Sequence, residues 1–576
     1  MENNEFAFDF AQYTKRNLFI TGKAGTGKTT FLRHLKSSAH KQMAVVAPTG
    51  VAAVNAGGTT IHSFFQLPFT PFIPTAEGRK DLIAKIKMQE HRRNVLRELE
   101  LLVIDEISMV RADLLDSIDC VLRHFRYRNN ELFGGVQVIY IGDMFQLSPV
   151  ATDEEWRMLS QYYPSPYFFH SQAVAQQPPL YIEFEKIYRQ TNASFIKVLN
   201  EIRNDCLSAE SLRLLEERYN PLFIPPVDDS YITLTTHNYK ADRINAEELA
   251  KINGKTYRFE AKITGDYPEK SYPTEKELEL KIGAKVMFLR NDTEQPRRYF
   301  NGKIGVVEKI EENAIAVRSI DDRELIKIEQ TAWENIRYSS NAKTRQIEEE
   351  MLGSFIQYPL RLAWAITIHK SQGLTFDKAV IDAGDAFAAG QVYVALSRCR
   401  SLEGLVLLSK INPQSIHNNR QIVEHERNKV PVDVLEGELD NSRKFYRSHI
   451  LQTLFNFGAL HEQAKQLLKE IKTVETSFND ETTPFLENIR EQLQNIDDIA
   501  VKFRQQLQSI FSGNPLDEDF LQSRVSAANG FFAGKIDNLI ETLRQSPAST
   551  DSRTNAAVYN TGIQTLFSDL ALKKHI

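Results

Sequence analysis

The chain is poor in the features that mark secreted, membrane-spanning or metal-clustered proteins. It has 3 cysteines in 576 residues, without the spacing of a zinc site or a disulfide framework. No segment approaches the roughly eighteen consecutive apolar residues of a membrane-spanning helix, so no membrane partner is expected. The first residues are acidic and polar, unlike those of a signal peptide. These absences predict a reduced, cytoplasmic protein.

An excess of positive charge is absent as well. The 70 Lys and Arg residues are outnumbered by 75 Asp and Glu residues, which gives a net charge of −5. This balance excludes a general electrostatic attraction to nucleic acid, so a polyanion would have to bind in a local basic groove. There is no internal repeat, and the length is too great for a single hydrophobic core.

A complete phosphate-binding loop is present. Residues Gly22–Thr29 fit the pattern G-x-x-x-x-G-K-[ST], between a short apolar strand at 17–20 and a helix at 30–35. Glycines let backbone N–H groups surround phosphates, Lys28 can reach the β- and γ-phosphates, and the Thr29 hydroxyl can hold Mg²⁺. The loop predicts binding of a nucleoside triphosphate. The residues assigned to it are Gly22, Ala24, Gly25, Thr26, Gly27, Lys28, Thr29 and Thr30.

Two carboxylates follow another apolar strand, at 101–104. Asp105 can hold the Mg²⁺ shell together with Thr29, and Glu106 can polarise the attacking water. An acidic strand end is common by itself, but after a phosphate-binding loop it favours hydrolysis. Gln146 follows a further strand, and its amide can both donate to and accept from groups near a γ-phosphate.

Other polar groups allow more than one interpretation. Arg189 and Arg398 are candidate arginine fingers, although most arginines lie at the surface or in ion pairs. Residues 365–373 place a hydroxyl, an imidazole, an ammonium and an amide together, which suits contacts to a phosphate backbone and equally a polar turn. Phe64 lies near small polar residues and can stack on a base or belong to the core.

Apolar runs predict the domain organisation. Continuous Val/Ile/Leu strands favour a doubly wound α/β domain over residues 1–180, with a Pro- and Phe-rich insertion at 66–97. A second α/β pattern is split into 181–242 and 355–432 by a β-rich insertion at 243–354.

The C-terminal region, 436–576, has a helical pattern. Apolar residues recur there every three or four positions, which predicts an antiparallel hairpin and then a helix over 520–543. The polar stretch 546–557 is expected to be flexible. Two runs of matching length favour an intramolecular hairpin, and hence a monomer, over a dimeric coiled coil.

Eight motifs in this order resemble the Pif family of superfamily 1B DNA helicases. After the phosphate-binding loop come Ala-Pro-Thr-Gly, Thr-Ile-His-Ser-Phe, Ile-Asp-Glu-Ile-Ser-Met, Gly-Asp-Met-Phe-Gln-Leu-Ser-Pro, Tyr-Arg-Gln, Thr-Ile-His-Lys-Ser-Gln-Gly and Tyr-Val-Ala-Leu-Ser-Arg. Residues 109–123 also resemble the helix that marks this family. The resemblance covers about residues 10–430 and leaves out 436–576.

The resemblance implies an α/β fold of two RecA-like P-loop motor domains with ATP and Mg²⁺ between them. The insertion at 66–97 would be a wedge, 243–354 an SH3-like module, and 436–576 an all-α extension. The resemblance also implies that Arg189 and Arg398 are the fingers, and Gln12 is a candidate adenine contact. The DNA contacts that it implies are Pro48, Thr49, His62, Phe64, Thr236, Asn238, His369, Lys370 and Ser371.

The predicted function is ATP-dependent 5′-to-3′ translocation on single-stranded DNA with unwinding of duplex junctions, in replication, repair, recombination or telomere-type maintenance. G-quadruplexes and DNA–RNA hybrids are further substrates in the family, and a bacterial member would be nucleoid-associated. One alternative is a translocase that displaces proteins from single strands and barely unwinds. Another is a scaffold that recruits a partner protein through 436–576.

Overall fold

The computed structural model describes residues 2–574 except 24, 187, 189–191, 227–228, 291, 293–297, 300, 321, 341–346, 369, 373, 383–389, 412–418, 514, 548–549 and 551. The chain forms two compact units, one mainly within residues 1–435 and the other mainly within 436–576. Within the described residues, every helix is too short or too polar to cross a membrane.

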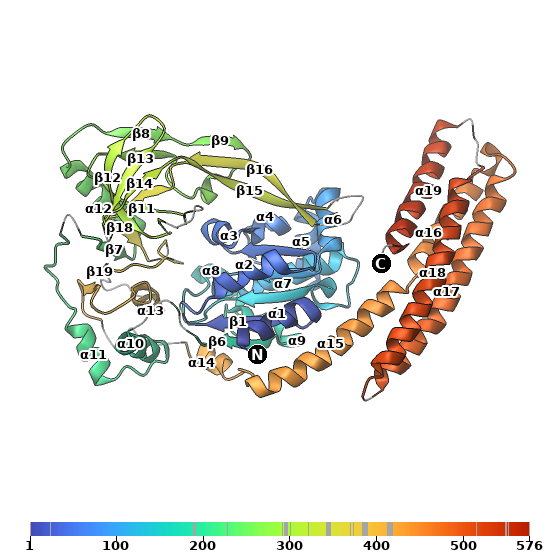
Figure 1. Cartoon of the computed structure of the whole chain (residues 1–576), viewed down its shortest axis with the longest axis horizontal. Coiled ribbons are helices and arrows are strands. Elements are labelled where there is room, and N and C mark those ends of the chain that lie inside the picture. The colour runs from blue at the N-terminus through green and yellow to red at the C-terminus, as the bar shows by residue number, and fades with distance from the viewer. Residues whose placement is uncertain are drawn as a thin grey trace. The chain divides into compact units, whose positions relative to one another are not determined.

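The first domain is built on a six-stranded parallel sheet with the order β3-β2-β4-β5-β1-β6. Its strands β1 and β6 are labelled side by side in Figure 1. Every residue of β1, β4 and β5 is buried, as expected for apolar strands covered on both faces. β6 pairs with β1, so this sheet extends past the boundary expected at residue 180. The strands are β1 (Leu18–Gly22), β2 (Met43–Ala47), β3 (Thr59–Thr60), β4 (Leu101–Ile104), β5 (Gln137–Ile141) and β6 (Leu180–Phe184).

Helices connect these strands and cover the sheet. Leu115, Ile118 and Leu122 recur along α7 at helical spacing and are buried in the core. The expected insertion at 66–97 contains two helices, α5 and α6. The helices are α1 (Asn3–Tyr13), α2 (Lys28–Ser38), α3 (Gly50–Ala56), α4 (Ile61–Phe65), α5 (Ala76–Lys85), α6 (Glu90–Glu98), α7 (Ala112–Phe125), α8 (Asp153–Leu159) and α9 (Gln172–Gln176).

The second domain has a four-stranded parallel sheet with the order β18-β7-β19-β20. Its buried side chains are continuous with those of the first domain in one hydrophobic core. In both sheets the loops that follow the strands leave from the carboxyl edge, where parallel α/β sheets bind ligands. The elements are β7 (Ile232–Thr235), β18 (Ala365–Thr367), β19 (Ala379–Asp382), β20 (Leu405–Leu407), α10 (Ala193–Arg203), α11 (Ala209–Glu216), α12 (Asn238–Lys251), α13 (Gln391–Leu396) and α14 (Arg420–Glu426).

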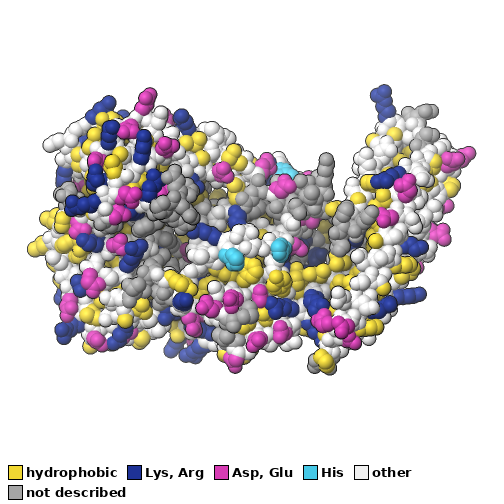
Figure 2. Space-filling view, in the orientation of Figure 1, with side chains coloured by type: hydrophobic (Ala, Val, Ile, Leu, Met, Phe, Trp, Pro, Cys, Tyr) yellow, Lys and Arg dark blue, Asp and Glu magenta, His cyan; other side chains and the backbone are white. Residues whose placement is uncertain are grey.

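An antiparallel β insertion separates β7 from β18 in sequence, as predicted. Its main sheet has the order β14-β13-β12-β11-β17 and encloses a core that includes Val286, Phe288 and Val317. Figure 2 shows Lys and Arg side chains interleaved with Asp and Glu over this part, so the face in view carries both signs of charge. The strands are β8 (Tyr257–Glu260), β9 (Lys262–Gly265), β10 (Glu277–Leu280), β11 (Lys285–Phe288), β12 (Ile304–Ile310), β13 (Ile315–Ser319), β14 (Leu325–Ile328), β15 (Thr331–Ser340), β16 (Ile347–Gln357) and β17 (Leu360–Leu362).

The C-terminal unit is helical. The predicted hairpin corresponds to α16 and α17, whose apolar stripes meet in one core, and α18 matches the helix expected at 520–543. The expected flexibility of 546–557 is wrong for its last part, because α19 begins at Arg553 and buries Tyr559 and Leu566 in the same core. The helices are α15 (Val432–Leu454), α16 (Gly458–Lys472), α17 (Thr482–Ser512), α18 (Glu518–Arg544) and α19 (Arg553–Lys574).

Candidate functional site

The loop between β1 and α2 is shaped to surround an anion. Gly25 and Gly27 have φ angles of 85° and 88°, in the left-handed region that side chains rarely adopt. Gly27 immediately precedes α2, so the first N–H groups of the helix point into the loop. A Cβ atom on Gly22 would lie 2.6 Å from the carbonyl oxygen of Phe184. Close packing against β6 therefore requires glycine there.

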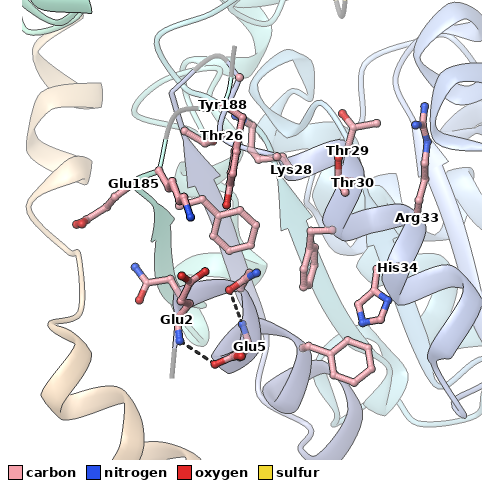
Figure 3. A pocket seen from close by; sticks show the side chains of 18 of the residues that line it. Glu2, Glu5, Thr26, Lys28, Thr29, Thr30, Arg33, His34, Glu185 and Tyr188 are labelled. Atoms are coloured by element: carbon pink, nitrogen blue, oxygen red, sulfur yellow. Dashed lines mark hydrogen bonds between the residues drawn. The ribbon is translucent and has the colours of Figure 1, made fainter. Parts of the chain in front are cut away.

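Lys28 folds over this loop. Its Nζ donates to the carbonyl oxygens of Gly22 at 2.6 Å and of Lys23 at 3.1 Å. In Figure 3, Thr26, Lys28 and Tyr188 lie together at one end of the pocket. The ammonium is thus held against the carbonyl oxygens of the loop, where it can neutralise a phosphate. Ala24 lies outside the described residues.

The two predicted carboxylates stand just beyond β4. Asp105 follows the strand directly, and Glu106 has a φ of 51°, which is rare for a residue other than glycine. Burial raises the pKa of both carboxyls, and the charge of Asp105 raises that of Glu106 further. The Lys28 ammonium acts in the opposite direction on both. The pair therefore sits close to the lysine of the phosphate-binding loop, as its sequence order suggested.

The oxygen donors at this edge fit Mg²⁺. Thr29 offers a hydroxyl and Asp105 a carboxylate, and a bound cation would offset the burial that disfavours the ionised form of Asp105. Among the described residues, no group of three or more His, Cys, Asp or Glu side chains could hold a metal by itself. Mg²⁺ commonly binds through one or two protein oxygens together with substrate phosphates, so this donor set suits an ion that arrives with a nucleotide.

Gln146 and Arg398 join the two α/β domains. Gln146 follows β5, and its Oε1 accepts a hydrogen bond from Arg398 Nη2 at 3.3 Å. Arg398 follows α13 of the second domain and is only 2% exposed. Its charge lowers the pKa of Glu106, against the effect of burial. The second domain thus contributes a guanidinium to the site of the first, while Arg189 lies outside the described residues.

A cleft of about 1580 Å³ connects these groups. The phosphate-binding loop and Glu106 line it together with Gln146 and Arg398. Its far end is lined by α1 and α2, where the rings of Phe8 and His34 stack with their centroids 5.0 Å apart. The space is ample for a nucleoside triphosphate, with flat rings available for a base.

The far end of the cleft differs from the prediction. Gln12 is buried away from the lining, and its Oε1 accepts the backbone N–H of His40 at 3.2 Å. Phe8 and His34 were missed because only their packing brings them to the cleft. Arg400 also lines the cleft and was missed, although it stands two positions after Arg398 in an arginine-rich turn.

The predicted DNA contacts divide into accessible and buried residues. Thr49, Asn238 and Lys370 are exposed and follow β2, β7 and β18, while Pro48, His62 and Thr236 are partly exposed. Pro48, Thr49, Thr236 and Lys370 lie in the segments that directly follow strands, while His62 belongs to α4 and Asn238 begins α12. His369 lies outside the described residues.

Two predicted DNA contacts are wrong because their side chains are buried. Phe64 is packed into the core edge-on against Phe65, with ring centroids 4.7 Å apart. Ser371 is fully buried, and its Oγ donates to the carbonyl oxygen of Ile368 at 2.6 Å. Both side chains are used by the fold, and neither can meet a strand at the surface.

An aromatic residue that the sequence reasoning did not single out is exposed instead. Phe69 is 75% exposed and stacks on His62, with ring centroids 4.7 Å apart and an interplanar angle of 18°. It belongs to the insertion at 66–97, and the Pro- and Phe-rich composition of that insertion is the sequence feature that could have indicated an exposed aromatic residue. Exposed stacked rings of this kind suit contact with an unpaired base.

Comparison with known proteins gives consistent matches. A family model described as "PIF1-like helicase" matches residues 8–210, and one described as "DNA helicase, middle domain" matches 438–576. The chain is 33% identical to the ATP-dependent DNA helicase Pif1 of Psychrobacter, over 69% of this chain and 66% of the relative. It is 30% identical to the Campylobacter jejuni enzyme of that name, over 69% of this chain and 90% of the relative. The chain therefore spans just under two thirds of the Psychrobacter relative.

Solved structures agree with these matches. Bacteroides Pif1 in complex with ADP-AlF4 is 42% identical, with a TM-score of 0.68, over 74% of this chain and 96% of that one. The same protein bound to single-stranded DNA matches over the same shares at 42% identity, with a TM-score of 0.53. These likenesses confirm the predicted fold class, which is a RecA-like α/β motor with insertions and a C-terminal helical region.

Proposed function

The chain belongs to the PIF1-like helicase family, and on that premise we propose that it is an ATP-dependent DNA helicase. The observation that carries the proposal is the hydrogen bond between Gln146 and Arg398, which joins the two domains beside the phosphate-binding loop. A triphosphate in this cleft would contact both domains, so its hydrolysis can change how they pack. A ligand that favours one packing over another is what a motor requires.

The proposed hydrolysis assigns one task to each side chain. Lys28 and the loop N–H groups hold the β- and γ-phosphates, and Arg398 stabilises charge on the transferred phosphoryl group. Glu106 positions the attacking water and takes its proton, for which a pKa raised by burial is suited. Thr29 and Asp105 would hold Mg²⁺, which neutralises phosphate charge when bound.

Coupling to DNA would use accessible residues that follow the strands of the two sheets. Thr49 and His62 belong to the first domain, and Thr236 and Lys370 to the second. If each pair holds the phosphate backbone, opening and closing of the cleft would advance one pair relative to the other. Contacts to phosphates do not read bases, so we expect little sequence preference and a strong dependence on salt.

Strand displacement is expected to require a 5′ single-stranded tail. The direction follows from the family resemblance, and a role in replication, repair or recombination is part of the same proposal. The measurement compares one duplex carrying either a 5′ or a 3′ tail, with and without ATP. Displacement of the 3′-tailed duplex alone would contradict the proposed direction, and ATP-independent separation would contradict the motor.

Phe69→Ala is expected to weaken binding of single-stranded DNA about tenfold, because base stacking on an aromatic ring contributes roughly 1–3 kcal/mol. ATP hydrolysis without DNA should stay unchanged, since Phe69 lies outside the cleft lining. Fluorescence anisotropy of a labelled oligonucleotide measures the affinity. Phe445→Ala is the matched control, because that ring is 78% exposed on α15. Equal affinities for the two variants would remove Phe69 from the DNA site.

A further inference from the structure

A cluster of charged side chains, most of them buried, adjoins Gln146. Arg203, the last residue of α10, is 3% exposed and lies 3.7 Å from Asp143, 3.6 Å from Glu183 and 3.5 Å from Glu426. Lys429 bridges the last two carboxylates, at 2.7 Å to Glu183 and 3.0 Å to Glu426. We call these five side chains the charge cluster. It joins the loop after β5 and strand β6 of the first domain to α10 and α14 of the second.

Asp143 determines which way the Gln146 amide points. The Nε2 of Gln146 donates to Asp143 Oδ2 at 3.1 Å, while Oε1 accepts from the Arg398 guanidinium. A carboxylate only accepts hydrogen bonds and a guanidinium only donates them. Turning the amide over would therefore place acceptor against acceptor and donor against donor. Gln146 thus meets Arg398 with its oxygen while Asp143 accepts the hydrogen bond from its nitrogen.

Arg203 is in a position to hold Asp143 there. Asp143 is 1% exposed, so a buried carboxylate at this place needs a nearby cation to offset its loss of hydration. The guanidinium carbon of Arg203 also lies 4.3 Å from the ring centroid of Phe145, which fixes the arginine over the loop that carries Gln146. Glu426 and Glu183 complete its surroundings, and Glu426 also accepts a hydrogen bond from the hydroxyl of Tyr181.

We propose that Arg203 is a positioning residue that sets the orientation of Gln146 through Asp143 and links that orientation to α14. The inference rests on the proposed ATP hydrolysis and adds a residue that does not line the nucleotide cleft. Because Arg203 and Glu426 belong to the second domain, the orientation of Gln146 depends on the packing of the two domains by two routes. One route is the hydrogen bond to Arg398, and the other is the charge cluster. α14 is followed by the chain that enters α15, so the same contacts connect the nucleotide cleft to the segment leading to the C-terminal unit.

Arg203→Lys tests the proposal, because lysine keeps the charge but loses the planar fork. We expect kcat for ATP to fall about tenfold, as for a catalytic group that is slightly misplaced, and KM for ATP to rise because the triphosphate binds less tightly. Affinity for ADP should stay at the wild-type value, while the preference for a non-hydrolysable ATP analogue over ADP should fall by a similar factor. Titration with fluorescent nucleotides measures that preference without turnover. Arg213→Lys is the matched control, because Arg213 is an exposed arginine paired with Glu217 on the surface.

Asp143→Asn is a second test of the positioning role, and it remains available if Arg203→Lys does not fold. It should lower the preference for the ATP analogue as Arg203→Lys does, and the double variant should be no worse than the more affected single one, because both changes act on one contact. Losses that add, or an unchanged analogue preference in Asp143→Asn, would overturn the positioning role. Hydrolysis of ATP by the wild type and by Arg213→Lys tests the proposed function separately. If both hydrolyse ATP and Arg203→Lys does so equally well, only the positioning role of Arg203 is refuted.

Discussion

Glu106→Gln is expected to bind ATP about as tightly as the wild type and to hydrolyse it about a thousandfold more slowly, within the range that general-base catalysis contributes. Glutamine keeps the size of the side chain and the unusual backbone conformation at Glu106, but it cannot take a proton from water. The phosphate-binding loop and Lys28 are unchanged, so the affinity should persist. Phosphate release in a single turnover and titration with a fluorescent ATP analogue measure the two quantities.

The control for this prediction is Glu260→Gln, at an exposed position on β8 in the β insertion. It makes the same chemical change away from the cleft and should leave both quantities unchanged. Normal hydrolysis by Glu106→Gln would show that another group activates the water. Loss of ATP binding would instead mean that Glu106 supports the phosphate-binding loop. The charge interaction between Glu106 and Lys28 provides a physical basis for that alternative.

The parts of the fold that could be predicted from sequence are those with a local cause. A continuous apolar run such as Leu101–Ile104 can be satisfied only by burial on both faces, so β4 was predicted at its observed bounds. β6 was assigned to the wrong side of a boundary because nothing local says which sheet a strand joins. Its pairing with β1 depends on residues about 160 positions earlier in the chain, as the register of Leu18 with Leu180 shows.

The same distinction separates the predictions for the site. The phosphate-binding loop was predictable because its chemistry and backbone geometry lie within consecutive residues. Phe64 and Phe69 are only five positions apart, yet one fills the core and the other is exposed, and composition does not distinguish them. Ser371 likewise looks like a surface hydroxyl in sequence, although the turn after β18 uses it internally. Accessibility is a property of tertiary packing, which single-sequence patterns do not carry.

The contact between Gln146 and Arg398 shows what sequence order can and cannot give. Their motifs were each recognisable, but the 252 positions between them gave no reason to expect a direct hydrogen bond. The bond places Gln146 of the first domain against the candidate arginine finger of the second. Arg398 tolerates burial because Glu106, Tyr393 and Asp143 favour its charged form against the loss of hydration.

Arg398→Lys is expected to lower ATP hydrolysis at least a thousandfold, because an arginine finger contributes about 10³ to 10⁵ in rate. Lysine keeps a positive charge in the buried site, but it has neither the planar fork nor the length to reach Gln146 and a phosphoryl group together. Binding of ATP should weaken only slightly, since the phosphate-binding loop is intact. The measurement is steady-state phosphate release beside nucleotide titration, with the thermal midpoint as the check on folding.

Arg400→Lys distinguishes the two arginines that line the cleft. Arg400 is exposed and pairs with Asp377 at 2.8 Å, so its guanidinium has a partner at the surface. If Arg398 is the finger, Arg400→Lys should retain most of the hydrolysis rate. A thousandfold loss in Arg400→Lys together with an active Arg398→Lys would exchange their roles. The burial of Arg398 beside Glu106 argues against that exchange. A guanidinium shielded from bulk solvent interacts with the charge of the transition state with little dielectric screening.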